Sequence, residues 1–221
     1  MKETGIIMSG NHPKLILEGK KTMTRRTRGL ERVNKEPDNW LLAAVFQDGK
    51  ARFSKLDGSQ ELTLKCPYGG YGDRLWVREI WRIFEWDNES GQFYIEYRSG
   101  GKSPALCVTD EVLEKYWLPN ANWPEDKWRP SLFMPRWASR ILLEITEVRA
   151  ERLQEITYAD ARAEGVLPYL LYRSLETPQA KKEEATLLAF QDLWDSLNGK
   201  RGFPWDGNWW VWPINFKKLE E

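Results

Sequence analysis

The chain has 221 residues and a hydrophobic fraction of 41%, which suffices for one domain with a sizeable core. Lys plus Arg and Asp plus Glu number 33 each, so the formal net charge is zero, whereas proteins that coat long nucleic acids carry a broad positive excess. One histidine and two cysteines argue against a disulfide framework and against a zinc site of the usual ligand type. We therefore expect no metal or cofactor, and we expect any nucleic-acid contact to come from a local patch.

The N-terminal residues predict a soluble, cytoplasmic protein that begins with a short strand and a short helix. Residues 1–5 lack the pattern of a signal peptide, and no apolar run approaches the length of about 18 residues that crosses a membrane. Residues 6–8 are a strand candidate. Pro13 suits the first turn of a helix that Gly19 ends.

A basic segment rich in threonine follows at residues 20–28. Five of its nine residues are cationic and three are threonine. Such a run is either a solvated loop or a site for an anionic or hydrogen-bonding ligand. Lys21 and Thr24 are three residues apart, which places them on one side of a helical turn but on opposite sides of a straight strand. Their joint use in chemistry therefore requires a turn or loop here.

The middle of the chain predicts antiparallel strands and then an insertion. Asp48-Gly49 between residues 40–46 and 50–54 is a strong hairpin signal, and residues 74–79 have the pattern of a strand. The long segment at residues 85–132 is of the kind that is commonly functional or mobile. It contains a strand at 93–97, an acidic helix near 110–117 and a Pro/Asn/Trp-rich loop at 119–124.

The C-terminal part first predicts one long strand, or two strands joined by a bend, at residues 141–153. Thr157 and Asp160 form the pattern of a capping box for a helix that stops at Gly165. A second helix spans about 182–197, because apolar residues recur there on one face.

Pro213 lies inside the last predicted strand, residues 209–216, and indicates that this strand is at a sheet edge. Strands dominate, the helices lie between them and no βαβ alternation appears. We therefore expect an α+β fold around a twisted or closed sheet.

Several segments together resemble the ASCH domain family. Residues 17–26 resemble its Gly-x-Lys-Thr-x-Thr-x-Arg segment, and residues 72–79 resemble its Gly-Asp-x-Leu strand entry. Residues 134–166 and 194–216 resemble the long version of the family found in phages and prophages. The resemblance covers most of the chain except parts of 85–132. It implies a PUA-like fold, a small β-barrel with flanking helices, in a single domain over residues 1–221 with an insertion at about 85–132.

The resemblance also implies a ligand class and a site. Relatives of that fold bind RNA or modified bases, and a short bacterial ASCH member is an amidohydrolase that acts on N4-acetylcytidine through a lysine, a threonine and a glutamate. On the matching segment, the lysine falls on Lys21 and the threonine on Thr24. The position at the end of a helix puts the glutamate at Glu164.

The residue chemistry is compatible with this site. An amide hydrolase without a metal needs a nucleophile, a base, a proton donor for the leaving amine and oxyanion donors. Thr24 can be the nucleophile, and Lys21 can be its base if its pKa falls well below ~10.4, which like charges and burial favour. Glu164 near a helix C-terminus suits a proton donor, although it could instead be an exposed carboxylate paired with Arg162 or a neighbour.

Further residues are candidate substrate contacts. Glu79 is a second candidate carboxylate, and the alternative is an ion pair with Arg25, Arg78 or Arg82. The other candidates offer a ring for stacking on a base or a cation for phosphate, with core packing or solvation as the alternative: Lys20, Arg25, Arg26, Trp76, Trp81, Trp137, Arg136 and Arg140.

Four functions remain open from the sequence. The leading hypothesis is a protein that binds a modified nucleoside or a short RNA and removes an N-acyl group from a cytidine-type base. The second is a non-catalytic module that binds RNA or DNA. The third is a metal-independent ribonuclease at the same cleft, and the fourth is a phage structural or assembly protein.

Overall fold

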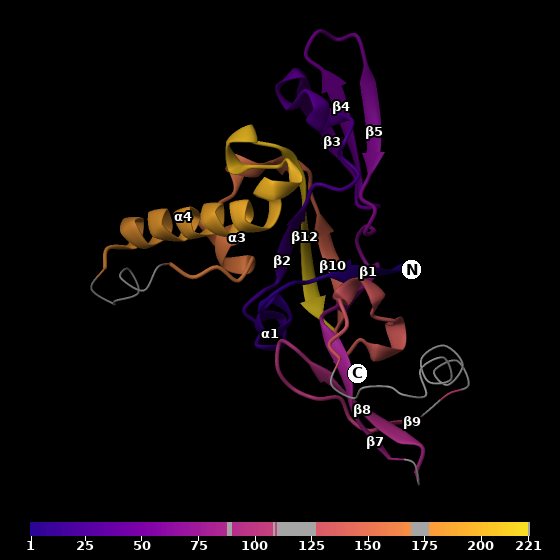
Figure 1. The fold of residues 1–221 in the computed structure, drawn as a ribbon. Coiled ribbons are helices and arrows are strands. Elements are labelled where there is room, and N and C mark those ends of the chain that lie inside the picture. Colours follow the sequence, from indigo (N-terminus) through magenta and orange to yellow (C-terminus); the bar gives the residue numbers. More distant parts are fainter. Residues whose placement is uncertain (88–89, 108, 110–126, 169–176, 221) are drawn as a thin grey trace. The chain divides into compact units, whose positions relative to one another are not determined.

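The computed structural model describes residues 1–87, 90–107, 109, 127–168 and 177–220 (Figure 1). The acidic helix and the Pro/Asn/Trp-rich loop expected between 110 and 124 lie outside these residues. The described chain forms two compact units. Unit 1 comprises residues 1–4, 15–75 and 143–221, and unit 2 comprises residues 5–14 and 76–142.

The largest sheet has six strands in the order β1-β6-β10-β12-β11, with β2 paired to β12. The chain passes from one unit to the other within β1, β6 and β10. The stretch expected to hold one long strand or two is divided into β10 and β11. The six strands are β1 (Glu3–Ile7), β2 (Met23–Arg26), β6 (Arg74–Arg78), β10 (Leu142–Val148), β11 (Glu151–Arg152) and β12 (Trp210–Lys218).

β12 is a central strand of this sheet, so the prediction that Pro213 marks an edge is wrong. Phe216 N–H donates to Thr22 O at 2.9 Å on the β2 side. Because hydrogen-bonded positions alternate along a strand, the amide position of Pro213 points away from β2. There β10 pairs only as far as Ile214 and β11 only from Val211. The missing N–H therefore falls where the partner strand is interrupted, and no ladder bond is lost.

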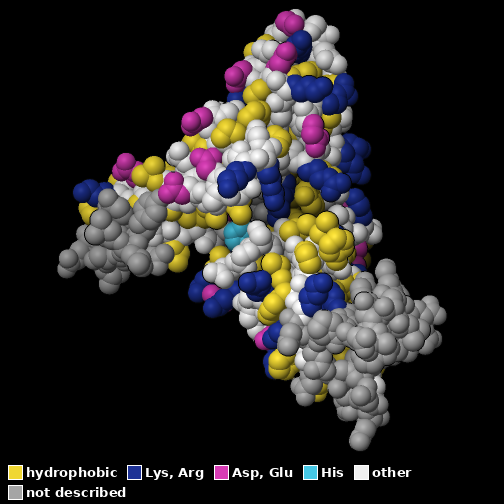
Figure 2. All heavy atoms as spheres, in the orientation of Figure 1, with side chains coloured by type: hydrophobic (Ala, Val, Ile, Leu, Met, Phe, Trp, Pro, Cys, Tyr) yellow, Lys and Arg dark blue, Asp and Glu magenta, His cyan; other side chains and the backbone are white. Residues whose placement is uncertain are grey.

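Unit 1 also contains a three-stranded sheet of β3 (Trp40–Val45), β4 (Lys50–Lys55) and β5 (Glu61–Lys65). The predicted hairpin around Asp48-Gly49 is confirmed: β3 and β4 are antiparallel, and Gly49 has the positive φ of 79° that favours glycine in such a turn. Phe53 and Leu62 face one another on the buried side. Lys and Arg side chains lie along this sheet on the surface shown in Figure 2.

Two helices belong wholly to unit 1, α3 (Tyr158–Ala163) and α4 (Gln179–Asn198). The capping box predicted for α3 is confirmed, because Thr157 Oγ1 accepts from Asp160 N–H and the Asp160 carboxylate accepts from Thr157 N–H. α3 packs against α4 and against β2. The core between the helices and β12 is apolar and includes Leu153, Ile156, Ala161, Val166, Phe190, Trp194 and Val211.

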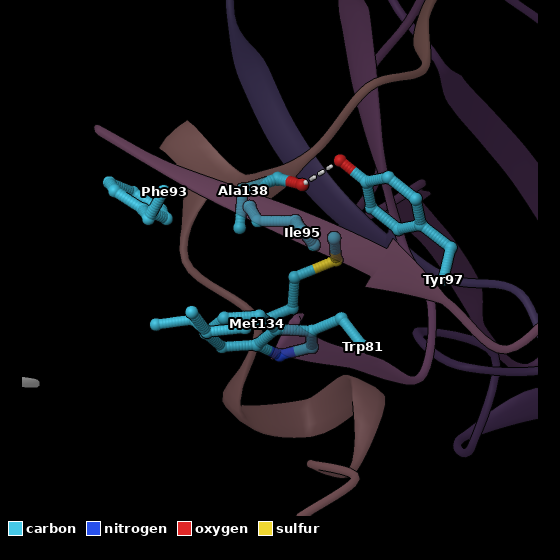
Figure 3. Packing of buried hydrophobic residues seen from close by; sticks show 7 residues of the cluster. Trp81, Phe93, Ile95, Tyr97, Met134 and Ala138 are labelled. Atoms are coloured by element: carbon cyan, nitrogen blue, oxygen red, sulfur yellow. Dashed lines mark hydrogen bonds between the residues drawn. The ribbon is translucent and has the colours of Figure 1, made fainter. Parts of the chain in front are cut away.

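Unit 2 has its own core. β7 (Trp81–Asp87), β8 (Gln92–Tyr97) and β9 (Leu106–Cys107) form a three-stranded sheet, which confirms the strand expected at 93–97. In Figure 3, Trp81 and Met134 pack beside one another, and Tyr97 Oη donates to Ala138 O at 3.0 Å. Helix α1 (His12–Leu17) connects the two units. Helices and sheets combine without βαβ repetition, so the α+β fold class is confirmed.

Candidate functional site

The centre of the basic segment is buried rather than solvated. Lys21 precedes β2 in an irregular stretch, and only 1% of the residue is exposed. Its backbone N–H donates to Leu15 O at 3.1 Å, and Thr22 N–H donates to Ala163 O at 2.8 Å. The end of α1 and the end of α3 thus fix the backbone from which the lysine projects.

Lys21 and Glu164 form a buried ion pair. Lys21 Nζ donates to Glu164 Oε2 at 2.7 Å and to the backbone oxygen of Glu164 at 2.8 Å. Glu164 is the C-terminal cap residue of α3, so the lysine also satisfies a carbonyl at the helix end. Two of the three residues that the ASCH resemblance assigns to the site are therefore in direct contact.

Gly165 allows the chain to reverse immediately after Glu164. Its φ of +85° is in the left-handed region, where a side chain is strained. A Cβ there would lie 3.0 Å from Leu15 Cδ1 and 3.3 Å from Lys21 Cβ. The glycine therefore permits both the helix stop and the close approach of the lysine segment.

Arg25 ties three carboxylates together around this ion pair. Its guanidinium lies 3.4 Å from Glu164 Oε1, 2.8 Å from Glu151 Oε1 and 2.9 Å from Asp160 Oδ2. Arg149 also reaches Glu151 and Asp160, each at 3.3 Å. The side chain of Arg25 is almost fully buried, and these carboxylates compensate its charge within the fold.

Burial and these charges shift two pKa values in the site. Burial lowers the pKa of the Lys21 amine below its ordinary value, Glu164 opposes the shift, and the cations of Arg26 and Arg25 add to it. Burial by itself would raise the pKa of the Asp160 carboxyl, but Arg25 and Arg149 hold it below its usual value. The site therefore favours the neutral amine of Lys21 at a lower pH than an exposed lysine would.

Thr24 is buried in β2, opposite Ile214 of β12. Side chains alternate along a strand, so Thr24 shares its face of β2 with Arg26, whereas Arg25 lies on the other face. Lys21 lies before the strand, where alternation does not fix its direction. The structure thus gathers Lys21, Arg25 and Glu164, and it places Thr24 beside them along the chain but on the opposite face from Arg25.

The two other predicted cations of this segment differ in exposure. Lys20 has 61% of its side chain exposed and pairs with Glu18 at 2.7 Å. The guanidinium of Arg26 lies 5.9 Å from the centre of the Tyr68 ring, and burial lowers its pKa. Lys20 is therefore the more exposed of the two, and Arg26 is half-buried.

The predicted carboxylate Glu79 belongs to unit 2, where it forms an ion pair with Arg140. Arg140 Nε and Nη2 donate to the two Glu79 oxygens at 2.9 and 3.1 Å, and Ser99 Oγ donates to Glu79 Oε2. Arg140 also lies 3.9 Å from the centre of the Tyr97 ring. The ion-pair partner of Glu79 is therefore Arg140 rather than Arg25, Arg78 or Arg82, the three alternatives that the sequence offered.

The remaining candidates of unit 2 are largely structural in their contacts. Trp137 meets Trp81 and Phe93 edge-on at 5.8 and 5.6 Å between ring centres. The guanidinium of Arg78 lies 4.8 Å from the centre of the Trp76 ring. Arg136 is half-buried in a short 3₁₀ turn (Arg136–Ala138) before β10.

Sequence reasoning did not find Glu151 and Arg149 as members of the Lys21–Glu164 site, and it found Asp160 only as a helix cap. The available signal was the alternation of charge in Arg149-Ala150-Glu151, which places both charges on one side of an extended chain. That pattern marks a charged face but does not name its partner. In the described ranges, no group of three His, Cys, Asp or Glu residues could hold a metal ion, and no helix there is long and apolar enough to cross a membrane.

Comparisons with known proteins add little to this geometry. No family model matches the chain, and the curated proteins searched give no match. A crystal structure of an ASCH domain from Lactobacillus crispatus JV V101 is similar over 98% of this chain and 79% of that chain, at 12% sequence identity and a TM-score of 0.36. Similarity of this degree establishes neither the family nor a shared fold.

Proposed function

We propose that the chain is an ASCH-like protein that binds a modified nucleoside or a short RNA and removes an N-acyl group from a cytidine-type base. The observation that carries this function is the buried Lys21–Glu164 contact of 2.7 Å, in which Arg25 also lies 3.4 Å from the Glu164 carboxylate. A buried lysine with a lowered pKa beside a carboxylate is typical of proton-transfer sites. The pairing also joins two of the three residues that the sequence resemblance assigns to catalysis.

The proposed reaction proceeds in balanced steps. Thr24 Oγ1 attacks the acyl carbon as its proton passes to neutral Lys21, and the C–N bond breaks as the resulting Lys21 ammonium gives that proton to the leaving amine, with the Glu164 carboxylate holding Lys21 in place. Water hydrolyses the acyl-threonine ester and restores the enzyme. Approach of Thr24 to the acyl carbon requires that the substrate lie across β2.

Release of cytidine from N4-acetylcytidine tests this function. Purified protein is incubated with the nucleoside, and cytidine is quantified by chromatography. We expect turnover by the wild type and by Thr24→Ser, which keeps a hydroxyl nucleophile. Thr24→Val has nearly the same shape without the hydroxyl, and it should lose roughly 100-fold or more in rate. Equal rates for Thr24→Val and the wild type would rule out the threonine as nucleophile.

A second candidate function is a non-catalytic module for RNA or DNA. It is favoured by the charge compensation in the site, since Lys21 and Arg25 already have buried carboxylate partners. Such a module binds an N4-acetylcytidine-containing oligonucleotide in a salt-sensitive way without releasing acetate. Equal binding by Thr24→Val and the wild type, with no hydrolysis by either, is the outcome that favours this function.

A further inference from the structure

The outer face of the sheet β3–β4–β5 carries a concentration of positive charge. Lys50 of β4 lies directly opposite Lys65 of β5, and Arg52 follows on the same face, opposite Thr63. Like charges directly opposite one another in a sheet are destabilising. This sheet nevertheless places two lysines opposite one another, with an arginine in the next position on the same face.

Only part of this charge is neutralised within the described chain. Lys50 pairs with Asp48 at 2.5 Å, and both side chains are about half exposed. Arg52 and Lys65 are exposed, and neither has an ion-pair partner among the described residues. Asp48 and Glu61, which lies opposite Ser54 on the same face, offset two of these charges, so the three cations still leave a local excess of positive charge in a protein whose net charge is zero.

One exposed aromatic ring adjoins these cations, and a second exposed ring belongs to a residue whose backbone is bonded to the β3–β4 turn. Phe46, which follows β3, is 40% exposed, and the Arg52 guanidinium lies 5.7 Å from the centre of its ring. Tyr71 is 66% exposed, and its N–H donates to Gln47 O at 2.8 Å, which ties it to the β3–β4 turn. Isolated exposed aromatics are common, but an exposed ring beside an unpaired Arg, on a sheet that carries further exposed lysines, forms the combination that binds single-stranded nucleic acid.

We propose that this basic-aromatic face (Phe46, Lys50, Arg52, Lys65 and Tyr71) binds single-stranded RNA. The cations contact phosphates, and the rings stack on unpaired bases, which needs no particular sequence. This extends the proposed function, whose ligand includes short RNA, by adding a surface for the strand outside the Lys21–Glu164 site. An acidic peptide would satisfy the cations but gives the rings no planar partner.

Fluorescence anisotropy with a labelled, unmodified single-stranded RNA tests the face. The variant Lys50→Ala/Arg52→Ala/Lys65→Ala should bind about tenfold or more weakly, and its slope of log affinity against log salt should fall by about 2, at ~0.7 per phosphate. The control Lys35→Ala/Lys181→Ala/Lys200→Ala removes the same charge from exposed positions elsewhere. It should bind as the wild type does. Equal weakening of both variants, or of neither, would overturn the proposal.

The aromatic contribution is tested separately. Phe46→Ser/Tyr71→Ser should weaken RNA binding about tenfold while leaving the salt slope unchanged, because stacking is lost without loss of a phosphate contact. A polyglutamate peptide that displaces RNA equally well from wild type and from this double variant would assign the face to acidic protein instead. The RNA carries no acylated base, so an absence of deacylase activity leaves these outcomes unaffected.

Discussion

At the scale of single residues, Lys21 is the side chain on which the proposed chemistry depends. Burying an ammonium ion is costly unless a carboxylate and further hydrogen bonds compensate it, and Lys21 has both in Glu164. Arg25 then shares the same carboxylate, so the three side chains depend on one another. Such a group is stable as a unit but sensitive to removal of any member.

Removal of the Glu164 charge should therefore make the protein less stable. We expect Glu164→Gln to lower the free energy of unfolding by roughly 3 kcal/mol, because it leaves Lys21 and Arg25 without part of their compensation. Lys21→Met/Glu164→Gln should recover part of that loss, since both charges are gone. Urea denaturation of both variants and of Lys21→Met gives the coupling energy of the pair. Strictly additive effects would show that the pair contributes nothing to the fold.

At the scale of elements, the end of α3 positions the glutamate. The capping box at Thr157 starts the helix, and Gly165 ends it with a positive φ. Glu164 is the last residue before Gly165, and its side chain contacts Lys21. The site is thus built from one short helix and the irregular stretch before β2, held by main-chain hydrogen bonds.

Gly165→Ala should displace this arrangement. The added Cβ meets Leu15 and Lys21, and the positive φ adds about 1 kcal/mol of strain. Gly58→Ala is the matched control, because Gly58 also has a positive φ but a Cβ added there would have no neighbour within 4 Å. We expect thermal unfolding to show a larger loss of stability for Gly165→Ala than for Gly58→Ala. Equal losses would mean that the contact with Lys21 does not matter.

Sequence reasoning succeeded for features that depend on residues close together in sequence and failed for features that depend on distant residues. The β3–β4 hairpin and the capped helix α3 depend on neighbouring residues, and alternation and capping patterns predicted both. The position of Pro213 depends on where β10 gives way to β11, which no local rule reveals. The burial of Lys21 and Arg25 likewise depends on carboxylates more than 100 residues away in sequence.

At the scale of the whole molecule, zero net charge restricts how much nucleic acid the protein can hold. The cations of the basic segment are mostly buried or paired, and the basic-aromatic face on the β3–β5 sheet is a local patch of positive charge. The composition indicated a local patch, but it did not indicate which element would carry it.

The affinity for single-stranded RNA should therefore stop rising steeply once the RNA exceeds a short length. We expect affinity for single-stranded RNA to rise with length up to about 10 nucleotides, the span of a single binding face, and then to increase only through the number of equivalent registers. The salt dependence should stay constant beyond that length. Binding titrations with a length series measure both quantities. A salt dependence that continues to steepen with length would indicate a more extensive surface.

The dependence of kcat/KM on pH tests the role of Lys21 most directly. The pKa of Lys21 is lowered in the fold, so the rate of cytidine release by the wild type should rise with pH as the amine loses its proton, below the ordinary value of ~10.4. Lys21→Arg keeps the positive charge beside Glu164 but cannot act as a base at any accessible pH. After circular dichroism shows that it is folded, we expect it to lose about 100-fold or more of the activity across the whole range. A folded Lys21→Arg variant with the wild-type rate and pH profile would contradict the assignment of Lys21 as the base.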